Sequence, residues 1–114
     1  MRVTEQEVTL GSVELIPPGE ARNFAVGNEP VAVFRTRSGE LFATQAACPH
    51  RNGPLADGLI GDTTVICPLH GWKFDLASGK LQGGDCKLKT YSVRVTSDGL
   101  VALTVGTAES VTTS

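Results

Sequence analysis

Short apolar runs separated by turn-forming residues make up the hydrophobic pattern of this chain. The runs are strand-length and rich in Val and Thr, and thirteen glycines and six prolines interrupt them. Such a pattern is typical of strands joined by tight turns. It predicts an all-β fold with strands near residues 7–13, 23–26, 31–36, 40–44, 63–66, 72–76, 88–95 and 100–105.

The strand pattern breaks between residues 48 and 61. This stretch carries Pro49, Gly53, Pro54, Gly58 and Gly61 and has little strand signal. It predicts a long ordered loop, and such a loop inside a small domain usually serves function. We also expect a flexible connection over residues 81–86 and a frayed polar tail over residues 106–114.

Composition narrows the possible classes of protein. A chain of 114 residues is long enough for one hydrophobic core, so we expect a single domain, residues 1–114. The formal charge of −2, with both signs interspersed, argues against nucleic acid or a membrane surface as partner. No apolar run approaches the ~20 residues of a membrane-spanning helix, and the acidic N-terminus does not fit a signal peptide. Few cysteines, with Cys86 left without a partner, favour a cytoplasmic location over a disulfide framework.

Two mixed cysteine–histidine motifs flank the centre of the chain. The first contains Cys48 and His50 and the second Cys67 and His70, with sixteen residues between His50 and Cys67. Thiolate and imidazole ligands suit a thiophilic metal rather than Mg²⁺ or Ca²⁺. A single structural zinc and a [2Fe–2S] cluster with two cysteine and two histidine ligands are both compatible with this set. Because each motif mixes the two ligand types, a binuclear centre held by two loops is favoured.

The pattern C-x-H followed by C-x-x-H, with a proline after each cysteine and Gly71 after the second histidine, resembles the Rieske iron–sulfur domain. The resemblance extends over residues 8–105. It implies an antiparallel β-sandwich or barrel-like base with a small inserted cluster-binding subdomain at about residues 45–76. It also implies that Cys48 and Cys67 bind one iron of a Rieske-type [2Fe–2S] cluster and that His50 and His70 bind the other.

Departures from the cytochrome bc type of Rieske protein indicate a low reduction potential. Gly53 and Leu69 stand where that type has two disulfide-bonded cysteines, and Trp72 and Phe74 stand where it has serine and tyrosine hydroxyls. Hydrogen-bond donors to sulfur stabilise the reduced cluster, so their loss lowers the potential. We expect a potential at the low end of the Rieske range, around −150 mV.

The resemblance implies a soluble electron carrier that is not an enzyme by itself. Both histidines of the chain are assigned to the cluster, so no mononuclear iron site remains for oxygenase chemistry. The implied partners are an NAD(P)H-dependent or flavin reductase and a terminal oxygenase, with Arg51 and Lys73 as charged docking candidates. The alternatives are the small subunit of an NAD(P)H-dependent nitrite reductase and a structural zinc module.

Overall fold

The computed structural model describes residues 5–26, 29–48, 54–68, 71–84 and 86–106. These ranges contain nine strands and two three-residue 3-10 helices, so the predicted all-β fold is confirmed. The strands are β1 (Glu5–Ser12), β2 (Glu20–Val26), β3 (Glu29–Arg35), β4 (Leu41–Gln45), β5 (Leu59–Ile60), β6 (Thr64–Ile66), β7 (Lys73–Asp75), β8 (Thr90–Val95) and β9 (Leu100–Gly106). The 3-10 helices are η1 (Val13–Leu15) and η2 (Leu55–Asp57), and no helix in the described ranges is long and apolar enough to cross a membrane.

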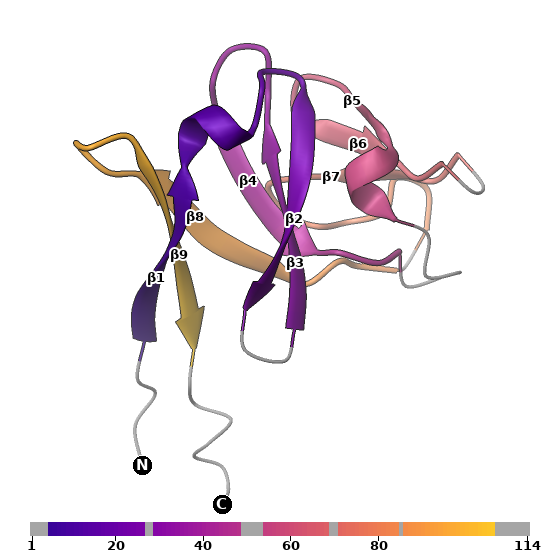
Figure 1. The fold of residues 1–114 in the computed structure, drawn as a ribbon. Coiled ribbons are helices and arrows are strands. Elements are labelled where there is room, and N and C mark those ends of the chain that lie inside the picture. The colour runs from indigo at the N-terminus through magenta and orange to yellow at the C-terminus, as the bar shows by residue number, and fades with distance from the viewer. Residues whose placement is uncertain (1–4, 27–28, 49–53, 69–70, 85, 107–114) are drawn as a thin grey trace, which may run out of the picture.

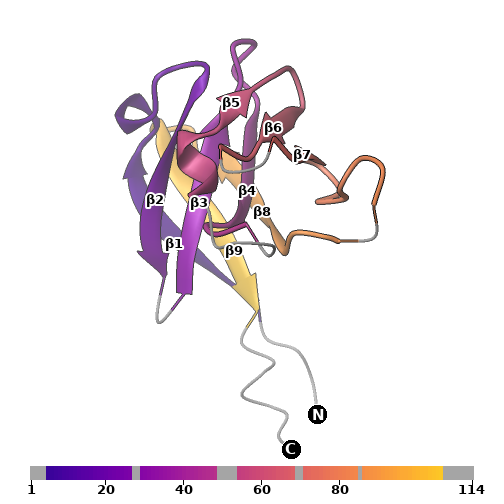
Figure 2. The same cartoon turned by 90° about the vertical axis from the view of Figure 1, so that its right-hand side faces the viewer.

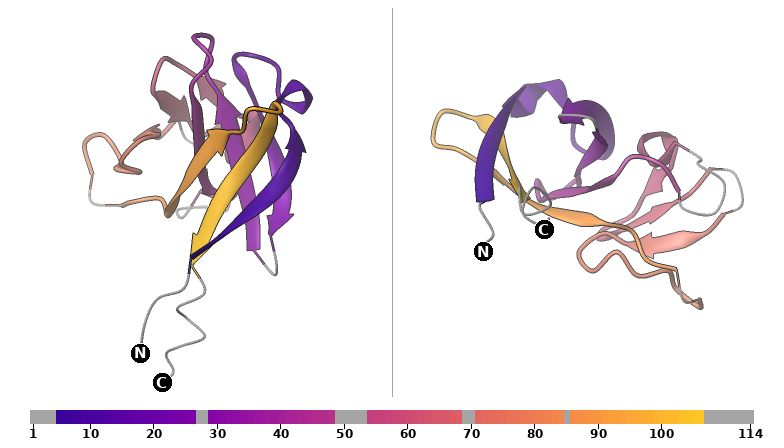
Figure 3. Two further views of the ribbon diagram at one scale, coloured as in Figure 1. Left: turned by 90° about the vertical axis from the view of Figure 1, so that its left-hand side faces the viewer. Right: turned by 90° about the horizontal axis from the view of Figure 1, so that it is seen from below.

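Six strands form one antiparallel sheet in the order β1-β9-β8-β4-β3-β2. The sheet curls strongly, so that β1 and β2 approach each other around a common interior (Figures 1 and 3). Fully buried side chains fill this interior, chiefly Ile16, Val31, Val33, Val101 and Leu103. The base predicted from the sequence is therefore a single curled antiparallel sheet.

Strand β3 is buried on both of its faces. Val31 and Val33 point into the curled interior, whereas Ala32 and Phe34 belong to a second apolar core on the opposite side. All four side chains are fully buried. Because successive side chains of a strand point to opposite faces, a strand packed on both sides is apolar throughout rather than alternating.

The second core joins the base to a smaller antiparallel sheet with the order β5-β6-β7. This sheet is inserted between β4 and β8 and lies beside the base (Figures 1 and 2). Val65 and Phe74 of this sheet and Leu55 of η2 pack in one cluster with Phe34 of the base. We call the described residues from Ala46 to Lys87, which form and surround this sheet, the inserted unit. The range of about residues 45–76 for a cluster-binding subdomain stays a prediction.

Two segments are more regular than the sequence indicated. The predicted loop from residue 48 to 61 contains η2 and the two-residue strand β5, which pairs with β6. The predicted flexible connection begins with Leu81, which bridges Phe74 of β7 and donates its N–H to the carbonyl oxygen of Cys86 at 3.0 Å. Gly106, predicted as the first residue of a polar tail, belongs to β9. Residues 107–114, which carry the rest of that prediction, lie outside the described residues.

Candidate metal centre

Cys48 begins a loop whose ends are held together by backbone pairing. β4 ends at Gln45, and Ala47, two positions further on, forms an isolated antiparallel bridge with Pro54. The N–H of Leu55 donates to the carbonyl oxygen of Ala46 at 3.0 Å and closes the same base. His50, together with the rest of residues 49–53, lies outside the described residues. Cys48 is therefore the first residue of a loop whose two ends are joined by backbone pairing.

Cys67 begins a second closed loop at the end of β6. Its N–H donates to the carbonyl oxygen of Trp72 at 2.8 Å, and its own carbonyl oxygen accepts the N–H of Gly71 at 3.0 Å. Gly71 has φ +72°, in the left-handed region that glycine adopts without a Cβ penalty. His70 and Leu69 lie outside the described residues. The turn after the second histidine thus explains why the motif ends in glycine.

The two thiols lie in the same apolar core. Cys48 and Cys67 are each 1% exposed, both belong to the cluster of Phe74 and Leu55, and neither forms a disulfide. Two buried cysteines at the starts of two adjacent closed loops, with a histidine two or three positions further on, are a donor set for a soft or borderline metal. Both cysteines of the predicted site therefore lie in one buried cluster, which is compatible with their binding a shared metal centre.

Aromatic side chains pack close to the cysteine loops. Phe74 is fully buried, and the ring of partly buried Trp72 lies 6.3 Å from it between centroids, tilted by 52°. Phe74 carries no hydroxyl group, so it cannot donate a hydrogen bond from this position. The apolar packing limits water around the two thiols, and solvent access is one of the factors that set the potential of such a site.

A side-chain bridge holds the two chain segments by which the inserted unit joins the base. The side-chain oxygen of Gln45 accepts the N–H of Lys89 at 2.8 Å, and its side-chain nitrogen donates to the carbonyl oxygen of Ala47 at 2.7 Å. The N–H of Gln45 also donates to the carbonyl oxygen of Lys89 at 2.8 Å. Since Ala47 directly precedes Cys48, this neck, formed by Gln45, Ala47 and Lys89, fixes the entry to the first cysteine loop.

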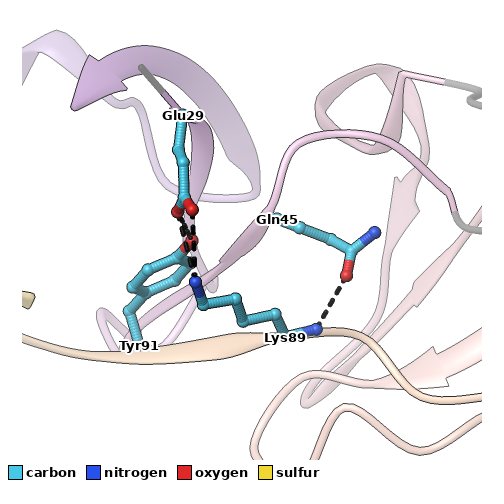
Figure 4. Close-up of polar contacts among 4 residues, drawn as sticks. All are labelled: Glu29, Gln45, Lys89 and Tyr91. Atoms are coloured by element: carbon cyan, nitrogen blue, oxygen red, sulfur yellow. Dashed lines mark hydrogen bonds and ion pairs between the residues drawn. The ribbon is translucent and has the colours of Figure 1, made fainter. Parts of the chain in front are cut away.

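An ionic cluster extends the neck onto the base sheet. The ammonium group of Lys89 lies 3.2 Å from a carboxylate oxygen of Glu29, and the hydroxyl of Tyr91 donates to the same oxygen at 2.8 Å (Figure 4). The Tyr91 hydroxyl, followed by Lys89, lowers the pKa of Glu29, while Glu29 raises the pKa of Lys89. The sequence did not predict this cluster, because Glu29 is far along the chain from Lys89 and Tyr91 and the three residues form no motif.

Three other side chains near the two cysteine loops are Asp75, Cys86 and Lys73. The carboxylate of Asp75 accepts the N–H of Ser78 at 2.7 Å in the turn that follows β7. Cys86, which the sequence left without a partner, is exposed and forms no disulfide. It lines a groove of about 490 Å³ that runs along residues 71–73 and 81–84. Lys73 is exposed, whereas Arg51 and Gly53 lie outside the described residues.

Comparison with known families decides between the two metals. The family model for the Rieske [2Fe-2S] domain matches residues 6–95, which is most of the chain. The chain belongs to the Rieske [2Fe-2S] domain family. Its cofactor is accordingly a Rieske-type [2Fe–2S] cluster, as predicted, and the buried cysteine pair is compatible with it.

Proteins similar to this Rieske domain include a dioxygenase ferredoxin subunit and structures described as nitrite reductase small subunits. The biphenyl dioxygenase ferredoxin subunit of Pseudomonas sp. (strain KKS102) is 39% identical over 87 residues, which cover 74% of this chain and 79% of that protein. A structure assigned as an NADH-dependent nitrite reductase small subunit from Mycobacterium tuberculosis has the same fold, with TM-score 0.83, 21% identity and coverage of 90% and 96%. A structure of oxygenase and ferredoxin in complex, from carbazole 1,9a-dioxygenase, matches with TM-score 0.72, 26% identity and coverage of 84% and 99%.

Other curated relatives are much longer than this chain. The chain spans 24% of a 4beta-methylsterol monooxygenase and 15–16% of two cholesterol 7-desaturases. In those proteins the matching Rieske domain is one part of a larger molecule. The ferredoxin subunits, by contrast, are matched over most of their length and fit the predicted electron carrier.

Proposed function

We propose that this Rieske domain is an electron carrier that receives electrons from an NAD(P)H-dependent reductase and passes them to a terminal oxygenase. Cys48 and Cys67 bind one iron and His50 and His70 bind the other. When bound, the cluster supplies a one-electron redox centre. The observation that carries the proposal is the pair of buried thiols at the starts of two closed loops, in a chain whose family model is the Rieske domain.

A carrier role is favoured over a catalytic role by the ligand inventory. The chain has two histidines, and the proposed cluster uses both of them. A mononuclear iron site of the oxygenase type requires two further histidines and a carboxylate. Ferredoxin subunits of dioxygenase systems are the electron-transfer components of multicomponent enzymes, and these are relatives that the chain matches at 32–39% identity.

The small subunit of an NAD(P)H-dependent nitrite reductase is the second candidate. It is supported by the shared fold of the Mycobacterium tuberculosis structure, which covers 90% of this chain. In either system the chemistry required of this chain is the same one-electron transfer. A structural zinc module is disfavoured, because the family match is to an iron–sulfur domain. The cytoplasmic location inferred from the cysteine usage stays a prediction.

A low reduction potential belongs to the same proposal. Phe74 is fully buried in the core shared with both cysteines and has no hydroxyl to donate toward sulfur. Fewer donors to the sulfur atoms leave the additional negative charge of the reduced cluster less stabilised. A potential near the low end of the Rieske range, around −150 mV, suits reduction by a flavin or NAD(P)H reductase rather than by a quinol.

The ligand assignment is tested by exchanging each cysteine for serine and measuring iron and acid-labile sulfide. Cys48→Ser and Cys67→Ser should lose the cluster and its visible absorption, because ligands and folding are coupled. Cys86→Ser is the matched control, since Cys86 is exposed and lies outside both motifs; it should retain two irons and two sulfides per chain. Stoichiometric zinc without sulfide in iron-replete wild-type protein would refute the assignment.

The carrier role is tested separately with the reductase and oxygenase of a biphenyl dioxygenase system. The holoprotein should accelerate NADH-dependent turnover of biphenyl by that pair and should produce no product without them. Acceleration of nitrite reduction by a nitrite reductase large subunit, with no effect on the oxygenase, would select the second candidate instead.

A further inference from the structure

Strand pairing in the inserted unit brings two rows of side chains onto one face. Leu59 pairs with Ile66, and Ile66 pairs with Lys73. The N–H of Gln82 donates to the carbonyl oxygen of Lys73 at 2.9 Å and extends this first row. Paired residues of antiparallel strands have side chains on the same face of the sheet. The first row is therefore Leu59, Ile66, Lys73 and Gln82.

The second row lies parallel to the first. Thr64 pairs with Asp75, the N–H of Asp75 donates to the carbonyl oxygen of Lys80 at 2.9 Å, and Lys80 bridges Lys87. Thr64 is two positions from Ile66 along β6, and Asp75 is two positions from Lys73 along β7, so both rows lie on the same face.

Burial assigns this face to the surface of the protein. The residues between the two rows, Val65, Phe74 and Leu81, pack toward the core. Lys73, Lys80 and Lys87 are exposed, and Leu59 is 72% exposed. We name the surface formed by Leu59, Ile66, Lys73, Lys80 and Lys87 the basic face. It combines three ammonium groups with one apolar end.

The positive charges of the basic face are not neutralised within the described part of the chain. No ion pair or side-chain hydrogen bond is found there for Lys73, Lys80 or Lys87. Asp75 lies in the second row, but its carboxylate accepts the N–H of Ser78 and forms no ion pair with Lys80. Three lysines and one aspartate give the two rows a net charge of +2 in a chain whose total is −2.

The arrangement of Lys80 and Lys87 costs stability in the isolated chain. They are bridge partners, and like charges directly opposite each other on neighbouring strands are destabilising. On the base sheet, by contrast, Arg94 lies 2.6 Å from a carboxylate oxygen of Glu7 and Lys89 lies 3.2 Å from one of Glu29. An external acidic surface would supply the negative charge that Lys80 and Lys87 lack.

The basic face is also contiguous with the second cysteine loop. Lys73 directly follows Trp72, whose carbonyl oxygen accepts the N–H of Cys67. Lys73 and Gln82 line the groove of about 490 Å³ that begins at Gly71. A protein that binds the basic face therefore contacts the same strand that closes the proposed metal site.

We propose that the basic face is the docking surface for an acidic patch of the protein that exchanges electrons with this carrier. The inference rests on the proposed function and adds the chemistry of the partner surface. A protein partner is favoured over nucleic acid or an anionic membrane because the remainder of the chain is acidic and repels an extended polyanion. Leu59 and Ile66 add an apolar end of the kind found in protein–protein interfaces.

The test uses the holoprotein and a decaglutamate peptide, which carries the carboxylate chemistry without a redox group. Binding is followed by amide chemical-shift changes and by titration at low and high salt. The peptide should bind wild type at about 20 mM salt, with the shift changes centred on Lys73, Lys80 and Lys87, and binding should weaken strongly toward 0.5 M salt because the charges are exposed.

Lys87→Glu and Arg37→Glu form a matched pair, since each lowers the net charge by the same amount. Arg37 is exposed on the turn between β3 and β4. Lys87→Glu should weaken peptide binding about tenfold, through the loss of attraction and the added repulsion, while Arg37→Glu should change it less than twofold. Lys87→Glu should also raise the melting temperature, because it converts a like-charge pair with Lys80 into an opposite-charge pair. Weaker binding by a more stable protein excludes misfolding as the cause.

Three results would overturn the docking proposal. These are no peptide binding by wild type at low salt, equal weakening in both variants, and preferential binding of duplex DNA or of phosphatidylserine vesicles with the same sensitivity to Lys87→Glu. None of them bears on the cluster, which is measured by iron and sulfide content. If the proposed function fails while the docking proposal holds, the protein binds the peptide but lacks the cluster or does not accelerate turnover by the reductase and oxygenase.

Discussion

The neck at Gln45 offers the most direct test of how the base controls the proposed metal site. Gln45→Ala removes two hydrogen bonds, one accepted from the N–H of Lys89 at 2.8 Å and one donated to the carbonyl oxygen of Ala47 at 2.7 Å. The first joins segments that are 44 positions apart in the chain. The second lies immediately before Cys48. The substitution should therefore loosen both the attachment of the inserted unit and the entry to the first cysteine loop.

The expected magnitude follows from these two bonds. A typical intramolecular hydrogen bond contributes about 0.5–1.5 kcal/mol to stability, so Gln45→Ala should cost roughly 1–3 kcal/mol. Gln45→Glu should cost at least as much at neutral pH, because an ionised carboxylate accepts from Lys89 but cannot donate to Ala47. In that variant a carboxylate oxygen faces the carbonyl oxygen of Ala47, and the two repel each other.

Denaturant unfolding of the holoprotein measures the free energy, and visible circular dichroism measures the environment of the cluster. Gln82→Ala is the matched control, because Gln82 is exposed and no side-chain hydrogen bond is found for it in the described part of the chain. We expect Gln45→Ala to lower stability and to change the visible spectrum, and Gln82→Ala to do neither. Equal stability and equal spectra for the two variants would refute a role of the neck in positioning the loop.

Three further predictions follow from other features of the fold. Gly58→Ala would place a Cβ against the backbone oxygen of Ile66 in β6 and should cost about 3 kcal/mol in denaturant unfolding. Gly83→Ala should cost less, because the space around Gly83 is open and only its positive φ is unfavourable; equal costs would contradict this. The pKa of Glu29 is lowered, so its contribution to stability is complete above the unfolded-state pKa and is lost as pH falls through the folded-state pKa. The free energy of unfolding, measured from pH 7 downward, should therefore depend less on pH in Glu29→Gln than in the wild type. Identical slopes for the two proteins would count against the ionic cluster. Combining Trp72→Ser with Phe74→Tyr should raise the midpoint potential in spectroelectrochemical titration by supplying hydroxyl donors, and an unchanged or lower potential would show that these positions do not reach the sulfur atoms.

The local pattern of the sequence predicted most of the strands and both cysteine loops. Alternation and turn residues are short-range properties, so β2, β4, β8 and β9 were identified with small errors at their ends. The expected loop over residues 48–61 proved to contain β5, because a two-residue strand has too few residues to produce a pattern. The hydrogen-bonded turn of Leu81 with Cys86 was missed for the same reason.

The sequence alone predicted the ligands of the proposed centre, because His50 and His70 are its two histidines and Cys48 and Cys67 are two of its three cysteines. Tertiary structure decided how that centre is supported. The burial of β3 on two faces, the bridge from Gln45 to Lys89 and the alignment of Lys73, Lys80 and Lys87 all depend on the register between strands. Register is set by hydrogen bonds and packing between distant segments, so no local pattern of residues specifies it.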